Sequence, residues 1–284
     1  MDVNEDGRID ILSGSYSRKE KDMAGLFQVL WGTEDGGFAA PEPLCGTDGK
    51  PLIIAADDKH VTDKICTRPT AVDLDGDGDL DLVVGNFSGT FAVFEGQGEG
   101  KFASANTWLE SDGNRIAVRS HGDPCFVDWD GDGDLDLVSG SAQGGVFLFR
   151  NEGSEAEPSF AHAETVLDVA EPRAGDTTFG AAHMKGPQHD TRVFVADVNG
   201  DGKFDLILGD AVRITYPAEG LDEDAAREQL GVWQKGLNEL VAARVAAAAA
   251  DKDSFDEKYA DHWKLREKII RSVSTGYVWV MLQK

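Results

Sequence analysis

The stretch DLDGDGDLDLVVG, residues 73–85, places five aspartates within nine residues directly before an apolar run. The run contains β-branched valines and ends on a glycine, which is typical of a buried β-strand. Carboxylates crowded beside such a strand repel one another unless a positive charge lies among them. The stretch therefore predicts an ordered acidic loop that leads directly into a core strand.

The acidic motif occurs four times in the chain, as DVNEDGRID (2–10), DLDGDGDLD (73–81), DWDGDGDLD (128–136) and DVNGDGKFD (197–205). Each copy precedes a similar strand, namely ILSGS, LVVGN, LVSGS or LILGD. A second shared strand opens on glycine, in residues 25–32, 89–96, 144–151 and 276–283. Self-similarity at this spacing indicates a repeat fold.

Two further extended segments complete the repeating unit. One follows the second strand in the first three units, at 36–44, 100–109 and 158–167, and another precedes the motif in the last three, at 68–73, 123–128 and 191–197. Four short antiparallel strands per unit are typical of β-propeller blades, which bury their faces on neighbouring blades. We therefore predict an all-β fold, a β-propeller of four-stranded blades in one domain spanning 1–284, with blade units at about 1–45, 66–110, 119–167 and 190–284.

The first unit lacks its first strand and the last unit lacks its last strand. Either these ends complete one another around a ring, or the four units belong to a larger propeller. We expect the second arrangement, because Met1 lies directly against a predicted ligand loop.

The last unit is interrupted between its second and third strands by an alanine-rich segment, 219–273. Acidic residues at its start suit a helix N-terminus, and a DKDS break at 251–254 divides it. Apolar residues follow at helical spacing: Leu230, Trp233, Leu237, Leu240, Val241 and Val245. The segment predicts an inserted hairpin of two antiparallel helices, whose apolar stripe packs on the propeller or binds a partner.

Composition excludes several classes of function. Aspartate and glutamate number 52 against 27 lysines and arginines, a net charge of -25, so nucleic acid and anionic membranes would be repelled and cations attracted. The chain has no apolar run of transmembrane length and no visible signal peptide. Its three cysteines, Cys45, Cys66 and Cys125, indicate neither a zinc site nor a disulfide framework, although a Cys45–Cys66 bridge stays open.

Within the motif, oxygen-bearing side chains stand at positions 1, 3, 5 and 9, and glycine stands at position 6 in every copy. Calcium takes six to eight oxygen ligands, and glycine permits the sharp curl that brings them together. Magnesium fits less well, because it keeps several of its waters. We predict up to four calcium ions. The predicted side-chain ligands are Asp2, Asn4, Asp6, Asp10, Asp73, Asp75, Asp77, Asp81, Asp128, Asp130, Asp132, Asp136, Asp197, Asn199, Asp201 and Asp205.

Position 7 is expected to supply a backbone carbonyl, from Arg8, Asp79, Asp134 and Lys203, with the Asp79 side chain in solvent. The first loop departs from the pattern at position 4, where Glu5 replaces glycine. The alternative for every loop is an acidic turn that holds no metal.

The continuation after the motif separates three kinds of calcium module. EF-hands and dockerins close at position 12 and continue into helix, whereas here the acid at position 9 is followed by strand. Thrombospondin-type repeats run almost continuously, whereas these motifs start 71, 55 and 69 residues apart. The chain resembles the FG-GAP, or VCBS, repeats of integrin α-type β-propellers over most of 1–216 and 274–284. The resemblance implies one calcium per loop between the first two strands of a blade, and an extracellular, periplasmic or surface location.

Charged residues recur on the predicted innermost strand. Arg68, Asp123 and Arg192 lie five residues before a motif, and His121 lies seven before. These four residues form a candidate ligand site at the mouth of the propeller channel, or else they pair with one another between blades. His183 and His189 are expected to be surface histidines. No G-x-S-x-G, H-E-x-x-H or phosphate-loop motif is present.

Two classes of function follow. The first is a non-catalytic calcium-stabilised scaffold that binds a protein or a glycan. The second is a secreted enzyme, or the accessory domain of a polysaccharide-degrading enzyme, with its site at the channel mouth. Convergence of Arg68, His121, Asp123 and Arg192 on one small cavity would favour the enzyme, and mutual pairing would favour the scaffold.

Overall fold

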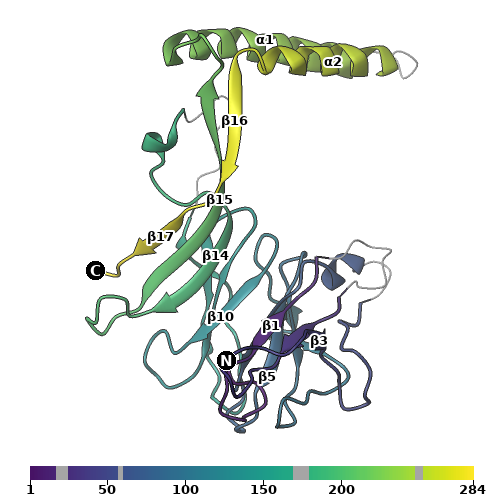
Figure 1. Cartoon of the computed structure of the whole chain (residues 1–284), viewed down its shortest axis with the longest axis vertical. Coiled ribbons are helices and arrows are strands. Elements are labelled where there is room, and N and C mark those ends of the chain that lie inside the picture. Colours follow the sequence, from purple (N-terminus) through teal and green to yellow (C-terminus); the bar gives the residue numbers. More distant parts are fainter. Residues whose placement is uncertain (17–24, 57–59, 169–178, 247–251) are drawn as a thin grey trace. The chain divides into compact units, whose positions relative to one another are not determined.

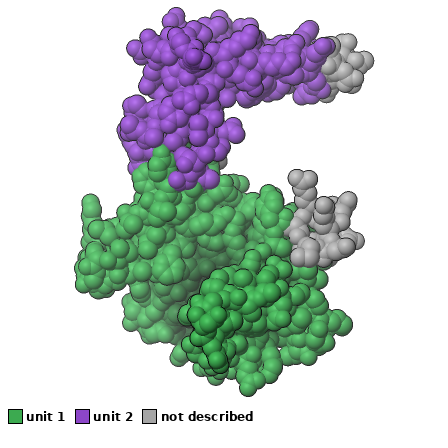
Figure 2. Space-filling view, in the orientation of Figure 1, with its two compact units in different colours: residues 1–169, 187–210, 277–284 green, residues 170–186, 211–276 purple. Residues whose placement is uncertain are grey.

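The structure, a computed structural model, describes residues 1–16, 25–56, 60–168, 179–246 and 252–284. It consists mostly of antiparallel β-sheets with two α-helices (Figure 1). The chain forms two compact units (Figure 2). Unit 1 comprises 1–169, 187–210 and 277–284, and unit 2 comprises 170–186 and 211–276, which contains the predicted helical insert.

Three sheets of unit 1 follow one another along the chain, and within each sheet consecutive strands pair antiparallel. Sheet 1 contains β1 (Ile11–Ser13), β2 (Gln28–Leu30) and β3 (Glu42–Pro43). Sheet 2 contains β4 (Arg68–Val72), β5 (Asp81–Gly85), β6 (Phe91–Phe94) and β7 (Thr107–Trp108). Sheet 3 contains β10 (Asp123–Val127), β11 (Asp136–Gly140), β12 (Val146–Phe149) and β13 (Glu164–Leu167). A small hairpin of β8 (Glu110–Ser111) and β9 (Asn114–Arg115) lies between sheets 2 and 3 in the sequence.

Sheet 4 is built around one long strand, β15 (Asp205–Pro217). Its first part pairs with β17 (Val278–Met281), and β14 (His189–Ala196) lies on its other side. Its second part pairs with β16 (Ile270–Thr275) in unit 2. The sequence prediction placed 270–273 in the helical insert, but these residues form strand, because β15 continues beyond Gly209 and offers its edge for pairing.

The two helices are α1 (Glu223–Ala246) and α2 (Lys252–Arg266). The predicted break at 251–254 lies partly outside the described residues, and α2 begins at Lys252. Trp233 and Leu237 of α1 are buried with Phe179 and Ile270 in a core of their own. The predicted apolar stripe is therefore buried only in its first half, since Val245 is 82% exposed. Neither described helix is long and apolar enough to cross a membrane.

Successive sheets of unit 1 pack face to face. One apolar core lies between sheets 1 and 2, a second between sheets 2 and 3, and a third between sheets 3 and 4. Every residue of β5, β6, β11 and β12 is buried. These strands are covered on both faces, which explains their continuous apolar runs in place of an alternating pattern. All three cysteines are free thiols, so Cys45 and Cys66 form no bridge.

The glycine that ends each second strand marks the closest approach between sheets. A Cβ on Gly14 would lie 1.8 Å from the Thr67 carbonyl oxygen, and one on Gly140 would lie 2.2 Å from that of Thr191. A Cβ on Gly85 would lie 2.1 Å from the Gly122 carbonyl oxygen. The obstructing carbonyl comes from the residue just before the first strand of the next sheet at Thr67 and Gly122, and from within that strand at Thr191. Glycine at this position therefore allows the next sheet to pack.

The fourth equivalent glycine provides a matched control for this packing argument. We expect Gly140→Ala to destabilise the protein by about 3 kcal/mol or more, because the backbone of 191 must move to admit a methyl group. Gly209→Ala should change stability by less than about 1 kcal/mol, because within the described part of the chain its Cβ would meet only the Cβ of Arg192, at 3.8 Å. Denaturant unfolding of both variants checks this prediction. Equal losses of stability in the two would show that the close approach does not matter.

Candidate metal centre

Each acidic loop curls in the same way at its central glycine. Gly7, Gly78, Gly133 and Gly202 have φ of 85°, 96°, 103° and 84°. In each loop the N–H of this glycine donates to the carboxylate of the first aspartate, over 2.7, 3.1, 3.1 and 2.9 Å respectively. The positive φ that the sequence predicted for position 6 is therefore confirmed, and it wraps the loop around its first carboxylate.

The carboxylate at the fifth loop position makes a second recurring hydrogen bond. It accepts the N–H of the seventh residue, over 2.9 Å in the first loop and 2.8 Å in the second. Position 4 is also left-handed, and here the first loop differs from the others. Glu5 has φ of 60° where Gly76, Gly131 and Gly200 have 70°, 80° and 75°. A glutamate in this region is strained, so the first loop is the least relaxed of the four.

The closing aspartate at position 9 has a role that the sequence did not reveal. In the second loop, the Asp81 carboxylate accepts the Leu74 N–H at 3.1 Å and the Gly96 N–H at 2.7 Å. The same pair of bonds occurs in the other three loops, in each case from the second loop residue and from the residue two positions after the end of the third strand. Asp10, Asp136 and Asp205 are the acceptors there. The closing aspartate thus ties its loop to the sheet whether or not an ion is bound.

These closing aspartates are buried, which changes their proton affinity. Burial raises the pKa of Asp81 to about 6, although the bonds from Gly96 and Leu74 oppose the shift and the charge on Asp75 adds to it. Burial likewise raises the pKa of Asp136. The exposed Asp197 shows the reverse, because the N–H groups of Gly202 and Gly200 lower its pKa. A nearby cation would favour the charged form of the buried pair.

Carboxylates gather in two of the loops. Oxygens of Asp73, Asp75 and Asp77 lie within 4.8 Å of one another in the second loop. Oxygens of Asp128, Asp130 and Asp136 do so in the third. These acidic groups could bind a metal ion. The first and fourth loops carry asparagine at position 3, and no such carboxylate triplet is found in either, although the structure describes both loops in full.

One atom of the second loop distinguishes it from an ordinary acidic turn. Asp73 Oδ1 is buried and accepts no hydrogen bond. A buried carboxylate oxygen without a partner is costly, and a cation satisfies it. The donor set of hard oxygens is the one that calcium prefers. The residues present therefore fit the predicted ion.

The side chain at position 7 is half-buried in the first three loops and exposed in the fourth. Asp79 is half-buried, and its Oδ1 lies 3.0 Å from where a Gly98 Cβ would stand. Arg8 pairs with Asp6 and donates from Nε to the Gly32 carbonyl at 2.9 Å. The Asp79 side chain, expected in solvent, is thus partly covered by the turn after β6.

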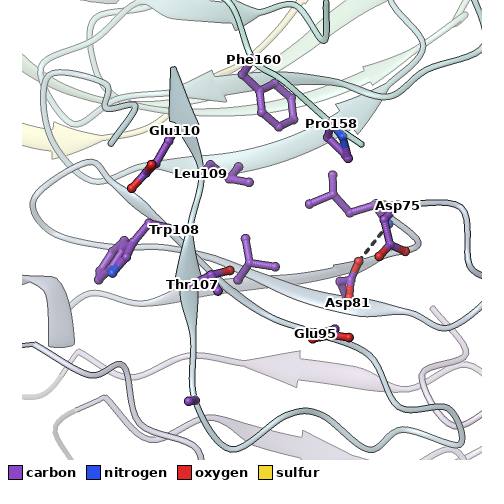
Figure 3. A pocket seen from close by; sticks show the side chains of 12 residues that line it. Asp75, Asp81, Glu95, Thr107, Trp108, Leu109, Glu110, Pro158 and Phe160 are labelled. Carbon is purple, nitrogen blue, oxygen red and sulfur yellow. Dashed lines mark hydrogen bonds between the residues drawn. The ribbon is translucent and has the colours of Figure 1, made fainter. Parts of the chain in front are cut away.

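The residue directly after the third strand differs between the two carboxylate clusters. In sheet 3 this residue is Arg150, which donates to Asp130 at 2.7 Å and to Glu164 at 2.9 Å. In sheet 2 it is Glu95, which lines the same cavity of about 370 Å³ as Asp75 and Asp81 (Figure 3). The second loop therefore has an additional carboxylate nearby where the third loop has a competing guanidinium.

The four inner-strand residues lie close enough for the charges of Arg68 and Arg192 to act on both Asp123 and His121. Arg68 Nε lies 3.7 Å from Asp123 Oδ1, and both side chains are about four-fifths buried, at 21% and 20% exposure. Arg192 instead donates to the Thr191 carbonyl at 3.0 Å. His121 bonds the Ser120 hydroxyl at 2.7 Å and lies against the Phe87 ring. Burial lowers the pKa of Arg68 and raises that of Asp123, and each charge opposes the shift of the other.

The two histidines ahead of the fourth motif are both exposed, as expected. His183 bonds the Phe179 carbonyl, and His189 begins β14. Neither histidine belongs to a group of potential metal ligands in the part of the chain that the structure describes.

The fold and its loops define a class of repeat protein in which antiparallel sheets pack in series and an acidic loop leads into the second strand of each. A family model described as an FG-GAP-like repeat matches residues 73–139 and 128–208. Residues 73–208 thus contain two FG-GAP-like repeats, as the sequence resemblance indicated. No curated protein and no solved structure matches it significantly.

The contrast between Arg150 and Glu95 predicts different cation affinities for the two loops. Arg150→Gln should raise the affinity of the third loop for calcium about 5-fold, since an ion pair worth about 1 kcal/mol no longer competes for Asp130. Glu95→Gln should weaken binding at the second loop. Calorimetric titration with calcium measures both effects.

Arg119→Gln is the matched control for Arg150→Gln. It removes the same charge and also breaks an exposed ion pair, with Asp168 at 3.5 Å, but Arg119 lies outside the acidic loops. An equal gain in affinity from both arginine variants would mean that only net charge matters. That outcome would refute specific competition for Asp130.

Proposed function

We propose that the protein is a calcium-stabilised β-propeller-like scaffold, extracellular or surface-exposed, that binds a partner without catalysis. FG-GAP-like repeats over 73–208 suggest a propeller-like binding scaffold. The observation that carries the calcium part is the buried, unpartnered Asp73 Oδ1 among three gathered carboxylates. Extracellular location follows only from the repeat class, and calcium near millimolar concentration suits such a setting.

Calcium would be held in the second loop by Asp73, Asp75 and Asp77, with the carbonyl of Asp79 as a further oxygen ligand. In the third loop Asp128, Asp130 and Asp136 are the gathered carboxylates. The chemistry that the ion supplies is neutralisation, because it replaces repulsion between carboxylates with attraction. The closing aspartates then transmit the order of each loop to its sheet through the two N–H bonds.

Removal of calcium tests this role. We expect the melting temperature to fall by about 5–10 °C in excess chelator, since an ion bound only to the folded chain and present at about 100 times its Kd contributes about 2.7 kcal/mol. Calorimetric melting should show recovery with added calcium and less with equal magnesium. An unchanged melting temperature, together with no bound calcium by elemental analysis, would contradict the proposal.

The bonds made by the inner-strand residues favour the scaffold over the enzyme alternative. Arg68 and Asp123 pair with each other, and Arg192 and His121 bond to groups of their own neighbours. None of the four lines the cavity beside the second loop. Mutual pairing was the arrangement expected of a scaffold, so we propose a non-catalytic role. Of the two ligand classes, we propose a protein, since the glycan assignment rests on resemblance alone.

The cavity beside the second loop is the surface we propose for a basic side chain of that partner. Its wall includes the buried Leu109 and Phe160, and the exposed Glu95 and Glu110 also line it (Figure 3). A volume of about 370 Å³ suits a side chain with an apolar stem and a cationic end. The net charge of -25 would also steer a basic partner toward the molecule.

A fluorescent lysine-rich peptide provides a probe for this cavity. We expect Glu110→Gln to weaken its binding about 3-fold or more, as measured by anisotropy in calcium, because one carboxylate facing the ammonium is lost. Glu34→Gln, an exposed glutamate in the turn after β2, is the control for general charge. Equal weakening by the two variants would show that the peptide binds to the overall charge and not to the cavity.

A further inference from the structure

Each sheet turns one set of side chains toward the sheet that follows it. On the third strand this set is Phe27 and Val29, Phe91 and Val93, and Val146 and Leu148 in sheets 1 to 3, none of them more than 9% exposed. The corresponding residues of sheet 4, Val278 and Val280, are 75% and 52% exposed. The same apolar pattern is therefore present in sheet 4 without a covering sheet.

The uncovered residues share one face of sheet 4. Because side chains alternate along a strand, Val193, Leu206 and Trp279 pack on sheet 3 and their neighbours point to the other side. Those neighbours are Phe194, Ile207, Val278 and Val280, which we call the rear face. Phe194 is 60% exposed and Ile207 is half-buried. Ile207 and Val280 stand directly opposite each other on β15 and β17, so the face is continuous (Figure 1).

Gly209 provides independent evidence that this face is a repeat interface. The glycines at its position in sheets 1 to 3 admit the backbone of the next sheet, as described above. Among the residues that the structure describes, only the Cβ of Arg192 lies within 4 Å of where a Cβ on Gly209 would stand, and no contact among them requires glycine there. Sheet 4 therefore keeps both the apolar face and the glycine that serve packing in the other sheets.

Sheet 1 also has an uncovered face, on the side that faces the preceding sheet in the other repeats. The positions at which sheets 2 to 4 face the preceding sheet correspond to Ile9, Ile11 and Leu30 in sheet 1, which we call the front face. Ile11 is 41% exposed, whereas its equivalents Leu82, Leu137 and Leu206 are at most 7% exposed. Ile9 is 62% exposed. The chain thus carries both halves of one type of interface, on its first and last sheets.

We propose that the rear face of one chain packs against the front face of a second copy, head to tail, in the geometry that joins consecutive sheets within the chain. This partner fits because its front face carries residues at the positions that pack on a preceding sheet in repeats 2 to 4. A symmetric pairing of two rear faces would reproduce no interface present in the chain. The proposal depends on sheet packing alone and does not rest on the proposed calcium or partner sites.

The strength of this association depends on the size of the contact and on the net charge of the two chains. In the described part of the chain sheet 1 has three strands where sheets 2 and 3 have four, so we expect a smaller contact than an internal one and no close approach at Gly209. Two chains of net charge -25 also repel each other, and salt screens this repulsion beyond about 10 Å. We therefore expect reversible association in the micromolar range that strengthens as salt rises.

Sedimentation velocity and light scattering of the full chain test the proposal, over about 1–200 µM in calcium and at low and high salt. The mass should rise with concentration. Val280→Lys on the rear face and Ile11→Lys on the front face should each leave the protein monomeric. Val245→Lys, at an 82% exposed position of α1, is the matched control and should associate normally. Phe194→Thr serves as a milder rear-face variant if Val280→Lys fails to fold.

Mixing the two variants distinguishes the proposed arrangement from others. Val280→Lys keeps its front face and Ile11→Lys keeps its rear face, so an equimolar mixture should form a dimer of one chain of each and stop there. A wild-type chain that stays monomeric at every concentration would overturn the proposal. So would self-association of Ile11→Lys, which indicates rear-to-rear pairing, or a mixture that remains monomeric while both variants keep the wild-type melting temperature.

Discussion

The bond pair made by the closing aspartate is the interaction on which the repeated part of this molecule depends. A loop rich in carboxylates has little tendency to hold one conformation beside an apolar sheet. The Asp81 carboxylate holds the loop in place by accepting one N–H from its own loop and one from Gly96, in the turn after β6. These two hydrogen bonds fix the loop to its sheet. The bond pair recurs with Asp10, Asp136 and Asp205, so every repeat has the same internal constraint.

This constraint also concerns the proposed ion. The closing aspartate is buried at the place where it accepts its two N–H bonds, and burial raises its pKa. A divalent cation beside it favours the ionised form that both N–H groups require. The gathered carboxylates and the sheet are thus coupled through one side chain, which is how an ion at the surface can stiffen a core. The scaffold role proposed for the chain follows from this coupling more than from any single loop.

A contact between two backbone segments limits how closely consecutive sheets can approach each other. Gly14, Gly85 and Gly140 each lie where a carbonyl in or just before the first strand of the next sheet passes, and no side chain larger than hydrogen fits. The apolar faces then bury in series, so each sheet depends on its neighbours for cover. The exposed valines of β17 and the exposed isoleucines near β1 are the two ends of this series.

The sequence by itself determined the repeat, the order of strands within it and the glycine curl of each loop. These features are local: a nine-residue motif, a positive φ at one glycine and apolar runs of strand length carry their own signal. It also placed the helices, but it extended them through 270–273, where pairing with the far end of β15 prevails. Such pairing joins residues far apart in the chain, and no local pattern records it.

Only the tertiary structure showed which charged residues meet. Arg150 reaches Asp130, and Arg68 pairs with Asp123, across strands or sheets. The role of the closing aspartate was hidden for the same reason, because one of its two donors lies 15 residues away in the case of Gly96. Hydrogen bonds and ion pairs depend on distances of a few ångströms, and those distances are set by how the sheets stack rather than by spacing in the sequence.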